Sequence, residues 1–197
     1  MCGCSGCWFL GTPVYGIADN FCRKQLSESE ALELVGRLID HFVFLVNSGE
    51  QALVIRKLAS SLSTIFLKPN SPWIRAVWNL AASLANGKHL SEEQCQSLDL
   101  GNTILPAMSE TQIVALLMFS NILGEEINKC SAEIKGTDYN KRVNENIADA
   151  LCLVEFVLRH VLQREASGNP VPDATPGTEA INSYNVSRLT RNICSGN

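Results

Sequence analysis

The amino-acid sequence predicts an all-α protein. Apolar residues recur at intervals of three and four along stretches of helical length, which is the period of an amphipathic helix. Short polar segments separate these stretches, and several of them end in residues that favour the start of a helix. No stretch alternates apolar and polar residues between hairpin turns, so we expect no β-sheet. The 197 residues, 46% of them hydrophobic, suffice to bury the core of one domain.

Capping residues predict five helix starts. In a capping box, a Ser side chain accepts a hydrogen bond from the amide three residues later, and a Glu or Gln at that later position returns one. The spacing occurs at Ser27/Glu30, Ser48/Gln51, Ser91/Gln94 and Ser109/Gln112. A fifth start, Ser71-Pro72-Trp73, places a capping Ser before a Pro at the first helical position, where the missing N–H is harmless.

The first three predicted helices cover residues 28–47, 49–68 and 72–86, and each has one apolar stripe. The stripe of the first helix consists of Leu32, Val35, Leu38, Ile39, Phe42, Leu45 and Val46. That of the second consists of Val54, Leu58, Leu62, Ile65 and Phe66. That of the third consists of Trp73, Val77, Trp78, Ala81 and Leu84.

The following part of the chain predicts one short helix and two long ones. The short helix covers residues 92–98, and we expect Gly101 and Pro106 to break the chain after it. The long helices cover about 110–129 and 139–165, and because they are apolar on more than one face, each must be covered on two sides. Their apolar residues are Ile113, Val114, Leu116, Leu117, Met118, Phe119, Ile122 and Leu123, then Val143, Ile147, Leu151, Val154, Phe156, Val157, Leu158, Val161 and Leu162.

Short turns between the helices predict antiparallel neighbours. Stacked helix pairs, such as those over 50–86 and 110–162, build a solenoid in which each repeat covers the next, and a closed bundle satisfies the same pattern. Around this helical region, residues 25–165, we predict two further regions. These are an unstructured leader rich in Cys and Gly over residues 1–24 and a disordered tail rich in Gly, Pro, Ser and Asn over 166–197.

Charge and cysteine usage argue against several classes of protein. A net charge of -4 and a pI near 5.4 disfavour nucleic-acid binding, which uses a concentrated basic excess. The longest apolar run, Ile113 to Phe119, is too short to cross a membrane, and the N-terminus lacks the features of a signal peptide. Isolated cysteines such as Cys95, Cys130 and Cys194 are typical of a reducing compartment. We therefore expect a soluble intracellular protein.

The cysteine-rich leader raises the question of a metal site. Cys2, Cys4 and Cys7 lie close together in the sequence, and Cys22 would complete a set of four thiols. A structural zinc module usually has two paired cysteine knuckles, whereas the second knuckle here is a single cysteine. We therefore expect no metal site, and no other motif predicts a cofactor.

The residues with catalytic potential are His41, His89, His160 and Cys152. Cys152 and His160 lie eight residues apart, which is about 12 Å along one helix and too far for a hydrogen bond. Cys152 also lies in an apolar run, where a thiol behaves as a small hydrophobic group. The sequence has no phosphate-binding Gly-rich loop and no nucleophile elbow. We expect that the chain is not an enzyme; a helical enzyme with a reactive cysteine is one alternative.

Charged and aromatic side chains outside these candidates have structural interpretations. We expect two exposed ion pairs along helices and two isolated basic doublets on the surface. The pairs are Glu126/Lys129 and Glu155/Arg159, and the doublets are Arg56-Lys57 and Lys141-Arg142. Trp73 and Trp78 either flank a peptide-binding groove or pack against a neighbouring helix, and packing is the role that we expect.

Two segments carry a resemblance to a known family. The first is GEQALVIRKLASSLSTIFLKPNSPWIRAVWNLAASL, residues 49–84, with Val54, Arg56, Lys57, Leu58, Leu62, Phe66 and Trp73 as the matching positions. The second is LLMFSNILGEEI, residues 116–127. They resemble the N-terminal HEAT repeats of the importin-β superfamily, the karyopherin-β nuclear transport receptors. Ala59 replaces a frequent Cys of the family's R-K-L-C-x-x-L helix, and Gly124 replaces the usual Pro of its L-x-x-L-x-x-L-P-E-E helix.

The resemblance covers residues 27–165 and implies a HEAT-like α-solenoid segment of two or three repeats. It implies a role in nucleocytoplasmic transport, with protein import favoured, and a location in the cytoplasm and the nucleus, including the nuclear pore. The implied partners are the small GTPase Ran in its GTP form, protein cargo and nucleoporin Phe-Gly repeats, with no direct nucleic acid and no membrane. It assigns no individual partner-binding residue. The alternative is a stand-alone helical-repeat adaptor or scaffold without transport activity.

Overall fold

The computed structural model describes residues 28–68, 75–130 and 136–168, and the structural statements below concern these residues. They form α-helices and one π-helical turn and contain no β-strand, so the all-α prediction is confirmed. The predicted leader, residues 1–24, lies outside the described residues. So does the predicted tail, except for residues 166–168.

The helices follow the predicted order. They are α2 (Glu28–Asn47), α3 (Ala52–Phe66), α4 (Ala76–Asn86), α5 (Glu92–Gln96), α6 (Leu105–Ala107), α7 (Glu110–Cys130) and α8 (Thr137–Ala166). The π-helical turn η1 (Leu100–Ile104) lies between α5 and α6. The break that we expected at Gly101 and Pro106 is therefore wrong, because Gly101 is part of η1 and Pro106 sits early in α6, where its missing N–H is harmless.

Two of the predicted capping boxes are present and one is absent. Ser91 and Gln94 exchange both hydrogen bonds at the start of α5. Ser109 and Gln112 do the same at the start of α7, with distances of 2.9 and 3.3 Å. The box at Ser48/Gln51 is wrong, because Ser48 follows the last turn of α2 and its hydroxyl donates to the Leu45 carbonyl at 3.2 Å. Gln51 is itself the N-cap of α3.

Two other predicted starts depend on residues that are not described. Ser27, the cap expected for α2, lies outside the described residues, and so do Ser71, Pro72 and Trp73. The third helix, α4, begins at Ala76 with Arg75 as its N-cap, so the helix predicted over 72–86 does not run through the non-helical Arg75. At its other end, α4 stops at Gly87, whose φ of 77° is the left-handed conformation that favours glycine.

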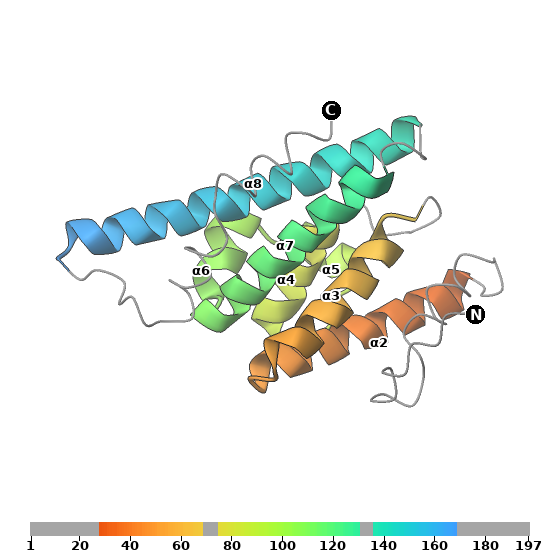
Figure 1. Ribbon diagram of the computed structural model, residues 1–197, viewed down its shortest axis with the longest axis horizontal. Coiled ribbons are helices and arrows are strands. Elements are labelled where there is room, and N and C mark those ends of the chain that lie inside the picture. The colour runs from red at the N-terminus through yellow and green to blue at the C-terminus, as the bar shows by residue number, and fades with distance from the viewer. Residues whose placement is uncertain (1–27, 69–74, 131–135, 169–197) are drawn as a thin grey trace.

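The long helices pack in two layers. α2 and α8 lie on opposite sides of the molecule, with α3, α4 and α7 between them (Figure 1). One layer consists of α2, α4 and α8, and in it α4 contacts both of the others. The other layer consists of α3 and α7, which contact each other. Across the layers, α2 pairs with α3 and α4 pairs with α7. α7 therefore touches α2, α3, α4 and α8.

We expected the two helices over residues 50–86, which are α3 and α4, to pack as a pair, and the observed pairing differs. Within the described segments, α3 and α4 make no extensive contact with each other. The buried stripe of α3, which includes Leu58, Leu62 and Phe66, packs instead against α2 and α7. Three phenylalanines join these helices, since the Phe119 ring lies edge-on to Phe42 and Phe66 with centroid distances of 6.4 and 5.9 Å.

α4 is buried on every side. Its buried residues are Ala76, Val77, Trp78, Asn79, Leu80, Ala81, Ala82, Ser83 and Leu84. The small side chains among them let the neighbouring helices approach closely. Because a helix without a solvent face has no water for its polar groups, its hydrogen bonds must come from protein.

Side chains from neighbouring elements supply several of these hydrogen bonds. The Val77 amide donates to Asn146 Oδ1 in α8 at 3.3 Å, and Ser83 Oγ accepts from the Leu90 amide at 3.2 Å. Gln112 at the start of α7 donates to the carbonyl of Leu84 at 2.9 Å and to Asn47 Oδ1 at 3.0 Å. Gln112 thus holds the start of α7 to the ends of α4 and α2.

The predicted apolar stripes are not covered everywhere. α7 is covered on two sides, as its pattern predicts. Leu32 of α2 and Val54 of α3 are partly exposed, although both belong to predicted stripes. In α8 the predicted second cover is missing from the described structure, where Leu151, Leu158 and Leu162 are 38%, 40% and 62% exposed.

The two capping boxes allow a matched test of the tertiary hydrogen bonds of Gln112. We expect Gln112→Ala to lower the free energy of unfolding by about 2 kcal/mol, because it removes a cap and two hydrogen bonds to other helices. Gln94→Ala, which removes a cap only, should cost about 1 kcal/mol or less. Urea denaturation measures both. Equal losses in the two variants would show that the contacts to α2 and α4 contribute nothing.

Candidate functional site

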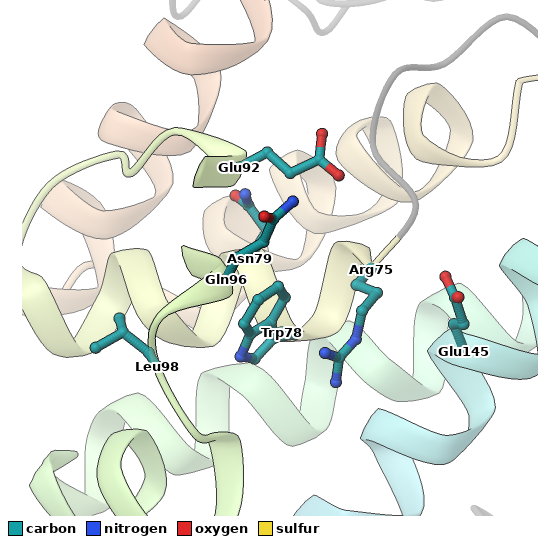
Figure 2. A pocket seen from close by; sticks show the side chains of 7 residues that line it. All are labelled: Arg75, Trp78, Asn79, Glu92, Gln96, Leu98 and Glu145. Carbon is teal, nitrogen blue, oxygen red and sulfur yellow. The ribbon is translucent and has the colours of Figure 1, made fainter. Parts of the chain in front are cut away.

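The described residues enclose a polar pocket beside the start of α4. Its volume is about 280 Å³, and its lining residues come from the start of α4, from α5 and the turn after it, and from α8 (Figure 2). They are Arg75, Trp78, Asn79, Glu92, Gln96, Leu98 and Glu145. We call this site the polar pocket.

Arg75, one of the lining residues of the polar pocket, forms an ion pair that joins the start of α4 to α8. The Arg75 guanidinium donates to both carboxylate oxygens of Asp149, through Nε at 3.1 Å to Oδ2 and through Nη2 to Oδ1. The Asp149 side chain is only 4% exposed, whereas that of Arg75 is 39% exposed. The guanidinium carbon also lies 4.2 Å from the centroid of the Trp78 ring, within range of a cation–π interaction.

Burial acts differently on the two partners of this pair. It raises the pKa of Asp149 above its ordinary value, and the hydrogen bonds from Arg75 only partly offset this effect. Burial lowers the pKa of Arg75, but the hydrogen bond and the charge of Asp149 outweigh it, so that pKa is raised. Removing the arginine would leave a buried carboxylate without its cation, whereas removing the carboxylate would leave a cation that water can reach.

The pair predicts a pH-dependent cost for Arg75→Ala. At about pH 7.5 the variant should lose about 3 kcal/mol of unfolding free energy, because an ionised Asp149 stays buried and unpaired. Without Arg75 the pKa of Asp149 rises further. A raised folded-state pKa gives stability that is present at low pH and is lost as the pH rises through it. The loss relative to wild type should therefore be clearly smaller at about pH 4.5.

Arg159→Ala is the matched control for this prediction. Arg159 pairs with Glu155 along α8, and both side chains are exposed, so its loss should change the free energy of unfolding by less than about 0.5 kcal/mol at either pH. Urea denaturation of both variants at the two pH values measures the effect. An Arg75→Ala cost that matches the control, or that grows as the pH falls, would contradict the assigned role of the pair.

A second hollow, the apolar groove, lies between α6, α7 and α8. Its volume is about 350 Å³. Apolar side chains cover most of its surface, namely Leu105, Pro106, Met108, Ile113, Val114, Leu117, Phe156, Val157 and Val161. His160, Gln163 and an ion pair from Arg164 to Glu110 at 3.1 Å provide its polar groups. An exposed apolar hollow with a few polar groups is typical of a surface that binds another molecule.

The outer end of α8 extends the apolar surface beyond this groove. In Figure 1 the C-terminal end of α8 projects past α6. Leu158 and Leu162 lie in this part of the helix and are exposed. Apolar side chains of α8 therefore face the groove and also the solvent beside it. Exposed apolar side chains near an apolar hollow are typical of a surface that binds another molecule.

The three histidines do not gather at one site. His41 stacks on Phe44 in α2, and His160 stacks on Phe156 in α8 with ring centroids 6.3 Å apart. His89 follows α4, and its amide donates to Asp40 Oδ1 at 2.6 Å. Burial lowers the pKa of His89, against the raising effect of Asp40. The His89 ring packs over Gly36, where an added Cβ would lie 3.2 Å from Nδ1, so a larger residue there would have to displace the ring by a few tenths of an ångström.

Of the described cysteines, Cys95 and Cys152 are free thiols. Cys95 is completely buried, and burial raises its pKa to about 11. Burial also raises the pKa of Cys152, whose sulfur lies against Gly101. A raised pKa leaves little thiolate, the form that reacts as a nucleophile. These environments do not activate either thiol.

The structure places no metal-binding cluster in the segments that it describes, where no three His, Cys, Asp or Glu side chains come together. Cys2, Cys4, Cys7 and Cys22, the thiols weighed as a zinc site, lie outside those segments. No helix there is both long and apolar enough to cross a membrane.

Several predicted surface residues behave as expected, and one does not. Glu126 pairs with Lys129 at 2.6 Å and Glu155 with Arg159 at 2.5 Å, so both predicted ion pairs are confirmed. Arg56, Lys57 and Lys141 are exposed. Arg142 is buried, which contradicts its prediction as part of a surface doublet: its guanidinium donates to the Lys68 carbonyl after α3 at 2.5 Å. Burial lowers its pKa.

Trp78 is the predicted residue that contributes to the polar pocket. It is 5% exposed, which confirms that it packs within the fold, while Trp73 lies outside the described residues. The sequence interpretation missed Arg75, Glu145 and Asp149. One signal was available, because Glu145 and Asp149 are like charges four residues apart on a helix, which is unfavourable unless a cation lies beside them.

Comparison of the chain with protein-family models, with curated proteins and with solved structures gives no match.

Proposed function

We propose that this chain is a protein-binding helical module of the α-solenoid type that takes part in nucleocytoplasmic transport. The observation that supports the proposal best is the two-layer packing of its helices. α2–α3 and α4–α7 are successive pairs, and their equivalent helices lie side by side, α2 with α4 and α3 with α7. This is the neighbour relation of stacked helical repeats, in which each pair covers the next.

α8 continues this series. It packs on α4 as α4 packs on α2, and so it occupies the place of the first helix of a third pair. The second helix of such a pair would lie against both α7 and α8. The apolar groove is at this position, with Ile113 and Leu117 from α7 and Phe156 and Val161 from α8. The groove thus offers an apolar surface to a helix or an extended segment of another protein.

The transport role is proposed from the resemblance to karyopherin-β receptors. Of the residues that carry this resemblance, Leu58, Leu62 and Phe66 are buried between helices, while Arg56 and Lys57 are exposed on α3. This division into packing and surface positions is compatible with a repeat helix. The proposed partners are Ran in its GTP form, protein cargo and nucleoporin Phe-Gly repeats, and the proposed location is the cytoplasm and the nucleus.

The nucleotide state of Ran gives the direct test. Immobilised chain should retain purified Ran loaded with GTP and should release most of the Ran loaded with GDP, because a transport receptor distinguishes the two states. The same GTPase in its GDP form is the control, so non-specific adhesion affects both arms equally. Weak and indistinguishable retention of the two forms would refute the transport role.

A second candidate function is a stand-alone adaptor or scaffold. It is favoured by the central position of α7, which touches four other long helices and joins them around one core. An adaptor of this kind would use the same apolar groove without any dependence on Ran. A monomeric, cooperatively unfolding protein that ignores the nucleotide state of Ran would favour this candidate.

A further inference from the structure

The chain leaves the described structure beside the apolar groove. α8 ends at Ala166, and Gln163 and Arg164, which line the groove, lie in its last turn. The Ser167 amide donates to the Gln163 carbonyl at 3.1 Å, and Gly168 follows with a φ of 69°. A glycine in this left-handed conformation at a helix end turns the chain away from the helix axis. The residues that follow therefore start next to one end of the groove.

These following residues include one segment with the pattern of a groove-binding helix. Residues 183–194, which we call the tail segment, contain neither Pro nor Gly. Three apolar residues of the segment have the spacing i, i+3 and i+7, which is typical of a helix that lies in an apolar groove. They are Val186, Leu189 and Ile193. Arg188 and Arg191 fall on the opposite face of such a helix, where water solvates them.

The connector between α8 and the tail segment has a suitable length. It covers residues 169–182, and its three prolines prevent α8 from continuing. The groove residues of α8 run from Phe156 to Arg164, which is about 12 Å along the helix. A flexible chain of the connector's length spans about 20 Å on average. The connector therefore reaches the whole groove and holds the tail segment there at an effective concentration on the order of millimolar.

We propose that the tail segment forms a helix that occupies the apolar groove of its own chain. Val186, Leu189 and Ile193 pack against α7 and α8, in the place of the second helix of the third pair, so the proposal rests on the proposed helical-module function. A short helix is stable in water only when its apolar face is covered. The disorder predicted for the tail then applies to this segment only when it leaves the groove. The tail segment is autoinhibitory, because another protein must displace it to bind there.

Hydrogen exchange of the full chain, measured by mass spectrometry, tests this contact. We expect the amides of the tail segment to exchange about tenfold more slowly than those of a free peptide of the same sequence, because the docked helix protects them. Val186→Asp should abolish this protection. Val171→Asp is the matched control, because it makes the same substitution in the connector and should leave the protection unchanged.

A substitution in the groove tests the contact from the other side. Val114 lines the groove and is half-buried, so Val114→Asp should also abolish the protection of the tail segment. Unchanged exchange in α4 would show that the core of this variant remains folded. An unprotected tail segment in the wild-type chain, or equal effects of Val186→Asp and Val171→Asp, would overturn the proposal.

A labelled peptide of residues 183–194 tests the autoinhibition. It should bind the full-length Val186→Asp variant, whose groove is open, and bind the wild-type chain about tenfold more weakly, because the tethered segment competes with it. Equal binding to both proteins, or binding to neither, would overturn the proposal. So would protection of the tail segment that appears only with dimers in sedimentation, because a second copy would then supply the segment. None of these measurements involves Ran, so their failure is distinguishable from failure of the transport role.

Discussion

The burial of α4 is the constraint on which the rest of this structure depends. A helix without a solvent face depends on the rest of the protein for its packing and for hydrogen bonds to its polar groups. Small residues at Ala81, Ala82 and Ser83 allow α2, α7 and α8 to approach it closely. Other elements then supply its polar contacts: Asp149 and Asn146 from α8 and Gln112 from α7. The position of each layer follows from these contacts.

The same arrangement produces the two candidate binding surfaces. Arg75 at the start of α4 binds Asp149 of α8, and it also lines the polar pocket. Because α8 packs on α4 and α7 with one side only, its other apolar residues face the groove and the solvent. One hollow is therefore lined mainly by polar and charged residues, and the other mainly by apolar residues.

The helices could be predicted well from the local sequence pattern, because helix formation depends on residues that are close together in the sequence. The bounds of α2 and α7 and the capping boxes at Ser91 and Ser109 follow from short-range spacing. The pairing of the helices does not, since the apolar stripe of α3 does not specify which helix covers it. Ser48 shows the same limit. Its spacing to Gln51 fits a capping box, but its hydroxyl donates to the Leu45 carbonyl at the end of α2 instead.

The candidate sites were less predictable for a related reason. Arg75 and Asp149 are 74 residues apart in sequence, and nothing local indicates that they meet. Arg142 was expected on the surface, because its neighbour Lys141 is a typical surface residue and its buried partner, the Lys68 carbonyl, belongs to a distant helix end. Long-range polar contacts of this kind depend on the packing of the apolar helices, which the sequence pattern leaves open.

Amide hydrogen exchange across the described helices tests the central role of α4 most directly. The account predicts that the amides of Leu80 to Leu84 are among the slowest in the protein and exchange only through global unfolding. Their opening free energy should then equal the unfolding free energy from urea denaturation. Faster exchange in α4 than in α3 or α7, with an opening free energy below the global value, would contradict it.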